Sequence, residues 1–195
     1  AIGDKLYSRY QPPADAEPFL VALLTWAEQS RHSVSLVDMT IAGLPLIYVN
    51  DAFCRVCEFS AKDILGQNCR ALQGPNTEPE SVSALLHALR NAEDVVVRIT
   101  NYKASGVPFE NVLAMRPVLD STRKVRYYVG VQTELASRGD ESARQAAALQ
   151  ALFDNLPQGL KGSGSEDSKP GAPGGVSRSG LTVRRSLGAG RGAPG

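Results

Sequence analysis

The segment 66–74 gathers reactive side chains into nine residues. It holds a thiol, Cys69, beside a guanidinium, Arg70, with amide side chains around them and a glycine at each end. A thiol with an ordinary pKa of about 8.5 is a weak nucleophile at neutral pH, so it reacts only when a partner activates it. The pattern alone is equally typical of a short polar helix that contains one small buried thiol.

A second set of polar side chains strengthens the functional interpretation. Asn101, Asn111 and Gln132 lie one on each of three predicted strands. If these strands pair antiparallel, all three amides can point from one face of the sheet into the same cleft. Buried amides need hydrogen-bond partners. A flat polar heterocycle would supply them.

The elements that position these side chains follow from the apolar pattern. Alternating and β-branched residues predict five strands, at 32–40, 45–50, 95–103, 109–119 and 125–135. Helical spacing predicts long helices at 16–30, 78–91 and within 137–160, and several short helices between 51 and 74. We therefore predict an α+β fold in which one five-stranded antiparallel sheet is closed by short helices over a cleft.

Composition divides the chain further. Residues 1–15 are polar and contain prolines, which predicts a flexible leader. Residues 31–136 form the expected core domain, between the flanking helices at 16–30 and 137–160. Residues 161–195 are rich in glycine, serine and proline and contain no apolar side chain larger than leucine, which predicts a disordered tail.

Charge and cysteine content exclude several classes of protein. The net charge is +1, so nothing favours nucleic-acid binding, and no apolar run of about 18 residues predicts a membrane span. Three cysteines cannot all pair with one another, which favours a reducing compartment and a cytoplasmic location. Cys54 and Cys57 have the spacing of metal ligands, but further ligands are scattered, so we expect no metal site.

The residues quoted so far resemble the LOV family, the blue-light-sensing, flavin-binding subclass of the PAS fold. Segment 66–74 is similar to the family motif GxNCRFLQG. Further agreement lies at 47–53, 101–103, 108–111 and 130–132, so the resemblance covers about residues 32–135. The cysteine motif and three separate amides agree with the family in both type and order.

The resemblance implies a role for each matched position. Cys69 would be the photoreactive thiol, which forms a reversible covalent adduct with flavin C4a in light. Gln132 would face flavin N5 and O4, and would relay the protonation of N5 to the flanking helices. The remaining cofactor contacts would be Asn101 and Asn111 at the pyrimidine edge, Asn68 and Gln73 at ribityl or ring oxygens, Arg70 at the phosphate of FMN, and Leu113 as a further cofactor-binding residue.

Two departures from the family pattern affect which flavin we expect. Ala71 replaces the usual Phe, and Leu86 stands where many members carry a second phosphate-binding Arg. Arg90, one turn later, is a candidate to replace that Arg. FMN is therefore the expected cofactor, with riboflavin as the alternative, because one lost phosphate partner weakens the discrimination between them.

The resemblance also implies how the domain is used. The two flanking helices are the expected output, and we expect them to form a homodimer. Any catalytic effector would lie outside this chain, so the chain itself is not expected to be an enzyme. The alternatives are a PAS-type ligand-binding or dimerisation module without photochemistry and, more remotely, a flavin-dependent redox enzyme.

Overall fold

A computed structural model describes residues 4–135, 140–154 and 156 of the chain. Five strands form one sheet in which every neighbouring pair is antiparallel, in the order β2-β1-β5-β4-β3. The strands are β1 (Ser33–Asp38), β2 (Leu46–Val49), β3 (Val95–Tyr102), β4 (Pro108–Leu119) and β5 (Val125–Glu134). The predicted α+β fold is thus confirmed, and each predicted strand corresponds to an observed one.

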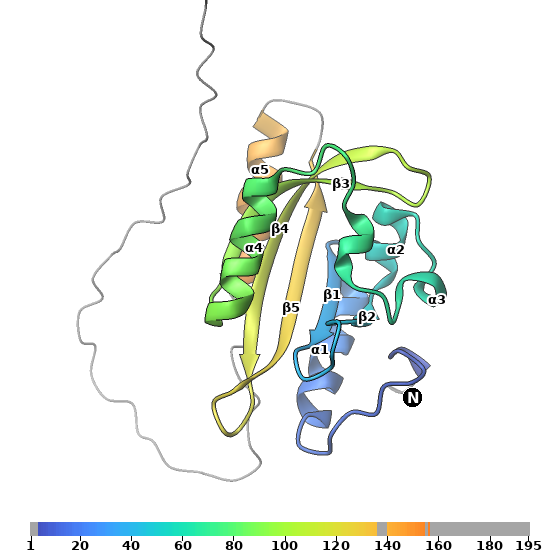
Figure 1. Cartoon of the computed structure of the whole chain (residues 1–195), viewed down its shortest axis with the longest axis vertical. Helices are drawn as coiled ribbons and strands as arrows, with labels where there is room; N and C mark the ends of the chain where they lie inside the picture. The colour runs from blue at the N-terminus through green and yellow to red at the C-terminus, as the bar shows by residue number, and fades with distance from the viewer. Residues whose placement is uncertain (1–3, 136–139, 155, 157–195) are drawn as a thin grey trace, which may run out of the picture. The chain divides into compact units, whose positions relative to one another are not determined.

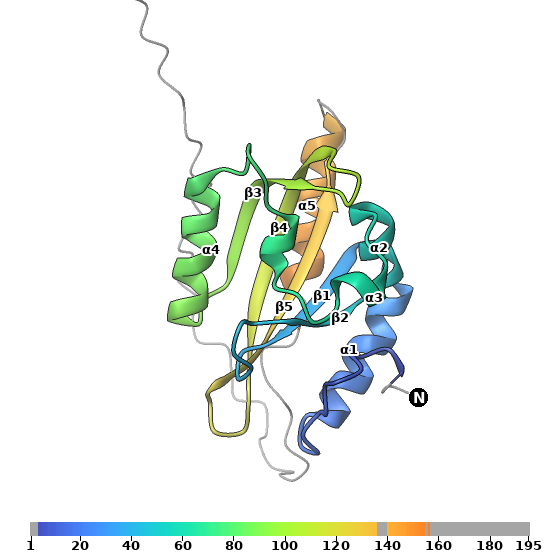
Figure 2. The ribbon, with the colours of Figure 1, turned by 45° about the vertical axis from the view of Figure 1, so that its right-hand side comes forward.

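The helices lie on both faces of this sheet (Figures 1 and 2). On the inner face, which carries the candidate site, are α2 (Asp51–Cys57), α3 (Ala61–Ile64), the 3-10 helix η2 (Cys69–Leu72) and α4 (Pro79–Asn91). On the outer face are the two flanking helices, α1 (Glu17–Gln29) and α5 (Asp140–Asp154).

The outer face is the larger apolar core. Its members come from α1, α5 and the strand positions that point away from the site. Side chains such as Leu20, Val131, Leu149 and Phe153 are buried together there. The apolar faces of both flanking helices are therefore occupied by the domain's own sheet. Burial of this kind stabilises helices of only four turns, which are marginal alone in water.

The inner face carries less apolar packing. One cluster, where α2 and α3 pack on the sheet, contains Val37, Phe53 and Ile64. Another, where α4 packs on the sheet, contains Leu85 and Tyr128. Between these two clusters the face stays open. The alternation of side chains along β1, β4 and β5 therefore separates a filled outer core from an inner face with room for a ligand.

Asn50 positions the first short helix. Its side-chain oxygen accepts from the backbone N–H of Phe53 at 3.0 Å, which caps α2, and from that of Val34 at 2.9 Å. Its amide nitrogen donates to the carbonyl of Ala27 at 2.8 Å. One buried side chain thus connects α1, β1 and α2, so the helix that borders the site begins at a defined place.

The predicted flexible leader is wrong for the part of it that the structure describes. Leu6 is buried in the outer core, and the N–H of Tyr7 donates to the carbonyl of Ile47 at 2.8 Å. The Tyr10 hydroxyl donates to Asp38 at 2.8 Å and lies 2.9 Å from the hydroxyl of Tyr127. Two tyrosines and a leucine thus hold a segment whose overall composition is polar. The predicted tail, 161–195, lies outside the described residues.

Candidate flavin pocket

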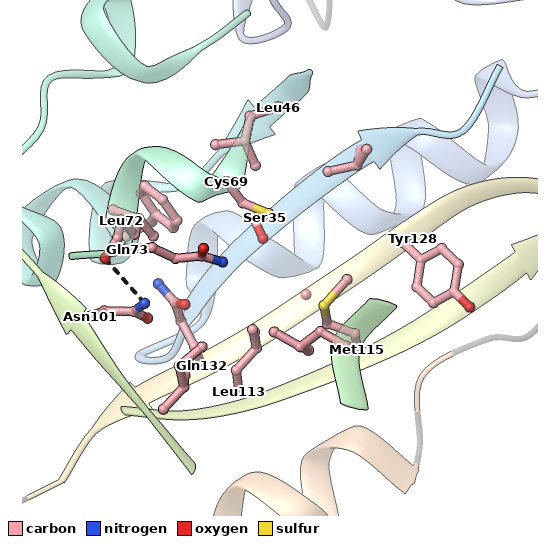
Figure 3. Close-up of a pocket in the computed structure, with 15 residues that line it drawn as sticks. Ser35, Leu46, Cys69, Leu72, Gln73, Asn101, Leu113, Met115, Tyr128 and Gln132 are labelled. Atoms are coloured by element: carbon pink, nitrogen blue, oxygen red, sulfur yellow. Dashed lines mark hydrogen bonds between the residues drawn. The ribbon is translucent and has the colours of Figure 1, made fainter. Parts of the chain in front are cut away.

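A pocket lies between the inner face of the sheet and the short helices (Figure 3). It contains about 530 Å³ of space free of atoms, counting the part open to solvent. Most of its lining is apolar, with members such as Val37, Leu46, Ile99 and Leu113. Its polar lining includes Cys69, Gln73, Asn101 and Gln132.

Cys69 is the first residue of η2, and Asn68 determines where η2 begins. The side-chain oxygen of Asn68 accepts from the N–H of Arg70 at 2.9 Å, and its amide nitrogen donates to the carbonyl of Gly43 at 2.7 Å. Asn68 also forms an isolated β-bridge with Pro45. The residue before the cysteine therefore fixes the cysteine's backbone, and does not itself line the pocket.

The thiol of Cys69 points from η2 toward the sheet, in the direction of Ser35 on β1 (Figure 3). Its side chain has substantial accessible surface, yet burial raises the pKa of the thiol above its usual value. Cys69 lines the pocket, so a thiol that protein atoms largely surround keeps accessible surface. Desolvation disfavours the thiolate, so Cys69 is a protonated thiol at neutral pH.

Three amides form one hydrogen-bonded row across the inner face of β3, β4 and β5. The amide nitrogen of Asn111 donates to the side-chain oxygen of Asn101 at 2.8 Å and to that of Gln132 at 3.0 Å. All three residues are nearly inaccessible: Asn101 is 4% exposed, Asn111 0% and Gln132 3%. The amide of Asn101 donates in turn to the carbonyl of Leu72 at 3.2 Å (Figure 3). The row therefore joins the sheet to the helix that carries Cys69.

One acceptor in this row has no partner. The side-chain oxygen of Asn111 is buried and accepts no hydrogen bond within the described structure. A buried acceptor without a donor is unfavourable by about 1–3 kcal/mol. A ligand that offers an N–H group between two carbonyl groups matches an amide row whose middle member has a free acceptor.

A glycine on β5 leaves room for a flat group. Gly130 lines the pocket, and a Cβ atom added to it would lie 2.7 Å from the hydroxyl oxygen of Ser35 and 3.7 Å from a methyl carbon of Leu113. The chain thus presents bare backbone where any other residue would place a side chain in the pocket.

The structure brings together most of the predicted site residues. Cys69, Gln73, Asn101, Leu113 and Gln132 line the pocket. Asn111 joins them through its hydrogen bonds to Asn101 and Gln132. The outcome differs for the residues expected at the ribityl chain and the phosphate: Asn68, Arg70 and Arg90 are not among the lining residues, and both arginines are exposed.

Sequence reasoning did not assign several lining residues. Ser35, Phe53, Met115 and Tyr128 all border the pocket. The sequence carried a signal for Met115, which follows Leu113 by two residues and so shares its face of β4. Ser35 enters the pocket through its pairing with Gly130 on β5, which only the structure shows. Ala71, by contrast, is exposed and does not line the pocket, so its small size does not enlarge it.

Comparisons with known proteins identify the family of this chain. The family model described as "PAS domain" matches residues 35–136, just over half of the chain. The LOV domain of the blue-light-activated histidine kinase EL346 from Erythrobacter litoralis is 40% identical, with a TM-score of 0.54 over 56% of this chain and 100% of that domain. The chain belongs to the LOV family of PAS domains.

Other proteins with LOV domains are also similar to this chain. A LOV protein of Rhodobacter sphaeroides superposes with a TM-score of 0.64 at 26% identity, over 72% of this chain and 85% of the other. Blue-light-activated histidine kinase 2 of Erythrobacter litoralis is 41% identical over 63% of this chain, and phototropin-1A of rice is 31% identical over 72% of it. This LOV domain spans only 37% and 16% of those two proteins.

Membership of the LOV family implies a flavin chromophore, and the residues present fit one. The pyrimidine edge of an isoalloxazine ring has an N–H between two carbonyl groups, which suits the free Asn111 oxygen and the amides around it. The apolar walls and the bare backbone at Gly130 suit a flat aromatic body. None of the described helices has the length and hydropathy of a membrane span.

Proposed function

We propose that this LOV domain senses blue light through a flavin held in the inner pocket, with Cys69 as the reactive residue. The observation that carries the proposal is the placement of Cys69 and the amide row on different walls of one pocket. A bound flavin would supply blue-light absorption and the ring carbon–nitrogen double bond across which the S–H group of Cys69 would add reversibly, with sulfur on carbon and the proton on nitrogen. Every other part of the cycle depends on residues of the chain.

Cys69 stays unreactive in darkness because its environment keeps it protonated. Burial raises the pKa of this thiol, so the thiolate that attacks an electrophile is scarce at neutral pH. The cap by Asn68 holds the sulfur in place, which removes the need for a diffusive encounter. A residue that is positioned and inert is suited to a reaction that begins only on illumination.

Gln132 is the proposed relay. Its amide carries both donors and an acceptor, so a rotation of the side chain exchanges the groups that it presents to the ring. Its present partners are the amide of Asn111, from which it accepts, and the sulfur of Cys57, which lies 3.5 Å from its nitrogen. After such a rotation the amide nitrogen of Gln132 would face Asn111, whose unpaired oxygen could accept from it once the Asn111 amide also turned.

The path from Gln132 to the outer face is short. Val131 precedes Gln132 on β5 and points to the opposite face, where it belongs to the core that contains Leu149 and Phe153 of α5. A change in backbone position at Gln132 therefore alters the surface on which α5 packs. We assign the light response to α5 on this basis.

The phosphate end of the cofactor is proposed to meet Arg70. This residue follows Cys69 directly, and its exposed side chain is free to reach a group that projects from the pocket mouth. Arg90 is the alternative partner, near the end of α4. FMN is the proposed cofactor, and riboflavin is expected to bind more weakly if Arg70 contributes.

The wider setting is proposed from the relatives. The two full-length relatives named above are a blue-light-activated histidine kinase and a phototropin, and this chain spans a minor part of each. We infer that this LOV domain regulates an effector in a longer protein and has no catalytic activity of its own. Homodimerisation would use surfaces of the flanking helices that the sheet leaves exposed, such as Val21 and Ala147. Three free cysteines support a reducing, cytoplasmic setting.

The decisive experiment is a visible spectrum of the flavin-loaded chain before and after blue illumination. We expect the absorption to bleach and to recover in darkness. Cys69→Ala should retain the flavin and lose the reversible bleaching, whereas Cys54→Ala, a cysteine outside the pocket lining, should behave like the native chain. Reversible bleaching in Cys69→Ala would contradict the assignment of Cys69 as the reactive residue. A chain that binds no flavin would contradict the proposed function and favour a PAS module that binds another ligand.

A further inference from the structure

Arg116 is a buried arginine that the proposed photochemistry does not use. It lies on β4, and its residue is 5% exposed. Its neighbour Met115 lines the flavin pocket on the inner face. Because successive side chains of a strand point to opposite faces, Arg116 points to the outer face, where α5 packs.

One side of the guanidinium holds the C-terminal end of α5. Its Nη1 donates to the carbonyl oxygens of Phe153 and Leu156, both at 2.8 Å. The guanidinium carbon also lies 4.4 Å from the centre of the Phe153 ring. The last carbonyls of a helix lack partners within the helix and carry partial negative charge, so a cation that donates to them is well placed.

The other side of the guanidinium is held by Asp94, which lies between α4 and β3. The Nε atom of Arg116 donates to the two carboxylate oxygens at 3.2 and 3.1 Å, and its Nη2 donates to one of them at 2.8 Å. This fork-to-carboxylate geometry fixes the plane of the guanidinium. With two of its nitrogens held by Asp94, the third is directed at the end of α5.

Apolar packing holds the rest of this helix. The residues of α5 that are buried are Ser142, Leu149 and Phe153, and Ala146 and Leu152 pack partly buried against the same core. The attachment of α5 to the sheet therefore combines this packing with the Arg116 contacts. The contribution of Arg116 is largest at the end of α5 that leads into the following part of the chain.

We propose that Arg116 is the positioning residue that anchors the C-terminal end of α5 to the sheet, with Asp94 orienting it. The anchor sets how much of α5 is docked in darkness, and so how large a change light can produce there. The inference rests on the proposed function in so far as light acts on α5, but the anchoring itself is independent of light.

Hydrogen–deuterium exchange of the flavin-loaded full chain in darkness tests the anchor. Arg116→Gln removes the charge and the fork, and should raise exchange in residues 149–154 at least tenfold while leaving α1 unchanged. Asp94→Asn keeps the arginine and should give an intermediate increase, and Asp94→Glu should restore native exchange within about twofold. Arg98→Gln is the matched control, because Arg98 is an exposed arginine on β3 that pairs with Glu110 at 3.1 Å.

A spectroscopic comparison separates anchoring from general stability. The light-induced change in α5 exchange should shrink at least threefold in Arg116→Gln, because the end of the helix is already released, while the amplitude of flavin bleaching stays native. Native exchange at 149–154 in both Arg116→Gln and Asp94→Asn would overturn the anchor. If Arg116→Gln does not fold, the comparison of Asp94→Asn with Asp94→Glu still tests the anchor. A native chain that bleaches without any change in α5 would instead contradict the proposed relay and leave the dark test of the anchor intact.

Discussion

Asn111 and Gln132 share one hydrogen bond, from the amide nitrogen of Asn111 to the side-chain oxygen of Gln132, at 3.0 Å. Asn111 is fully inaccessible, and its own oxygen has no partner. The amide of Asn111 thus has a nitrogen that donates to Gln132 and an oxygen that accepts no hydrogen bond within the described residues. Turning both amides would pair the Asn111 oxygen with the Gln132 nitrogen, in place of the present bond.

Replacing Gln132 with Leu should separate photochemistry from output. Flavin bleaching is expected to persist, since Cys69 is untouched, whereas the light-induced change in α5 should be lost. Removing the acceptor for Asn111 should also lower the free energy of unfolding by about 1–3 kcal/mol. Exchange measurements on α5 in light and darkness check the first result, and chemical denaturation checks the second. A full-sized light response of α5 in this variant would exclude Gln132 from the pathway.

Gly130→Ala should weaken flavin binding without unfolding the chain. The new Cβ would approach the Ser35 hydroxyl to 2.7 Å, which a rotation of that hydroxyl relieves, and its other contacts are of ordinary length. We expect flavin affinity to fall at least tenfold, measured by fluorescence titration, with little change in the unfolding of the flavin-free protein. In the double variant with Ser35→Ala the weakened binding should remain, because the methyl group still occupies the pocket. Native affinity in both variants would show that the ring does not approach Gly130.

Arg70→Ala should reduce FMN affinity and leave riboflavin affinity unchanged. An exposed arginine that meets a phosphate is expected to contribute about 1 kcal/mol, or roughly three- to tenfold in the dissociation constant. Arg90→Ala identifies the alternative partner, and Arg98→Ala controls for the loss of one surface charge. Equal affinities for FMN and riboflavin in the native chain would mean that neither arginine recognises the phosphate.

The stability of the folded chain should fall as the pH rises above about 8.5. Burial raises the pKa of the Cys57 thiol to about 12, whereas an unfolded cysteine titrates near 8.5. Above the unfolded value the unfolded chain binds fewer protons than the folded one, so the free energy of unfolding declines with a slope of at most about 1.4 kcal/mol per pH unit for this group.

Denaturation between pH 8 and pH 10 measures that slope in the native chain and in Cys57→Val, where it should be shallower. Cys54→Val is the matched control on the same helix, because Cys54 is only half-buried. Burial raises its pKa as well, so a smaller effect is expected. Identical slopes in the native chain and Cys57→Val would contradict a protonated Cys57.

Most of the fold was predictable from local patterns. Strand and helix positions follow from alternation and helical spacing, and five observed strands correspond to the five predicted ranges. The leader was not predictable in this way, because its polar composition conceals the contacts of Leu6, Tyr7 and Tyr10 with residues far along the chain. Average composition cannot reveal individual long-range contacts.

The sequence by itself determined which side chains are available: a cysteine before an arginine, and one amide on each of three strands. Side-chain alternation is a local property, so it allowed those amides to share a face, and the strand pairing decided that they do. Only the tertiary structure decided that Asn68 holds the backbone of η2, that one Asn111 oxygen is unpaired, and that Arg116 reaches the end of α5. Such contacts depend on the relative placement of elements distant in sequence, which strand register and helix packing set together.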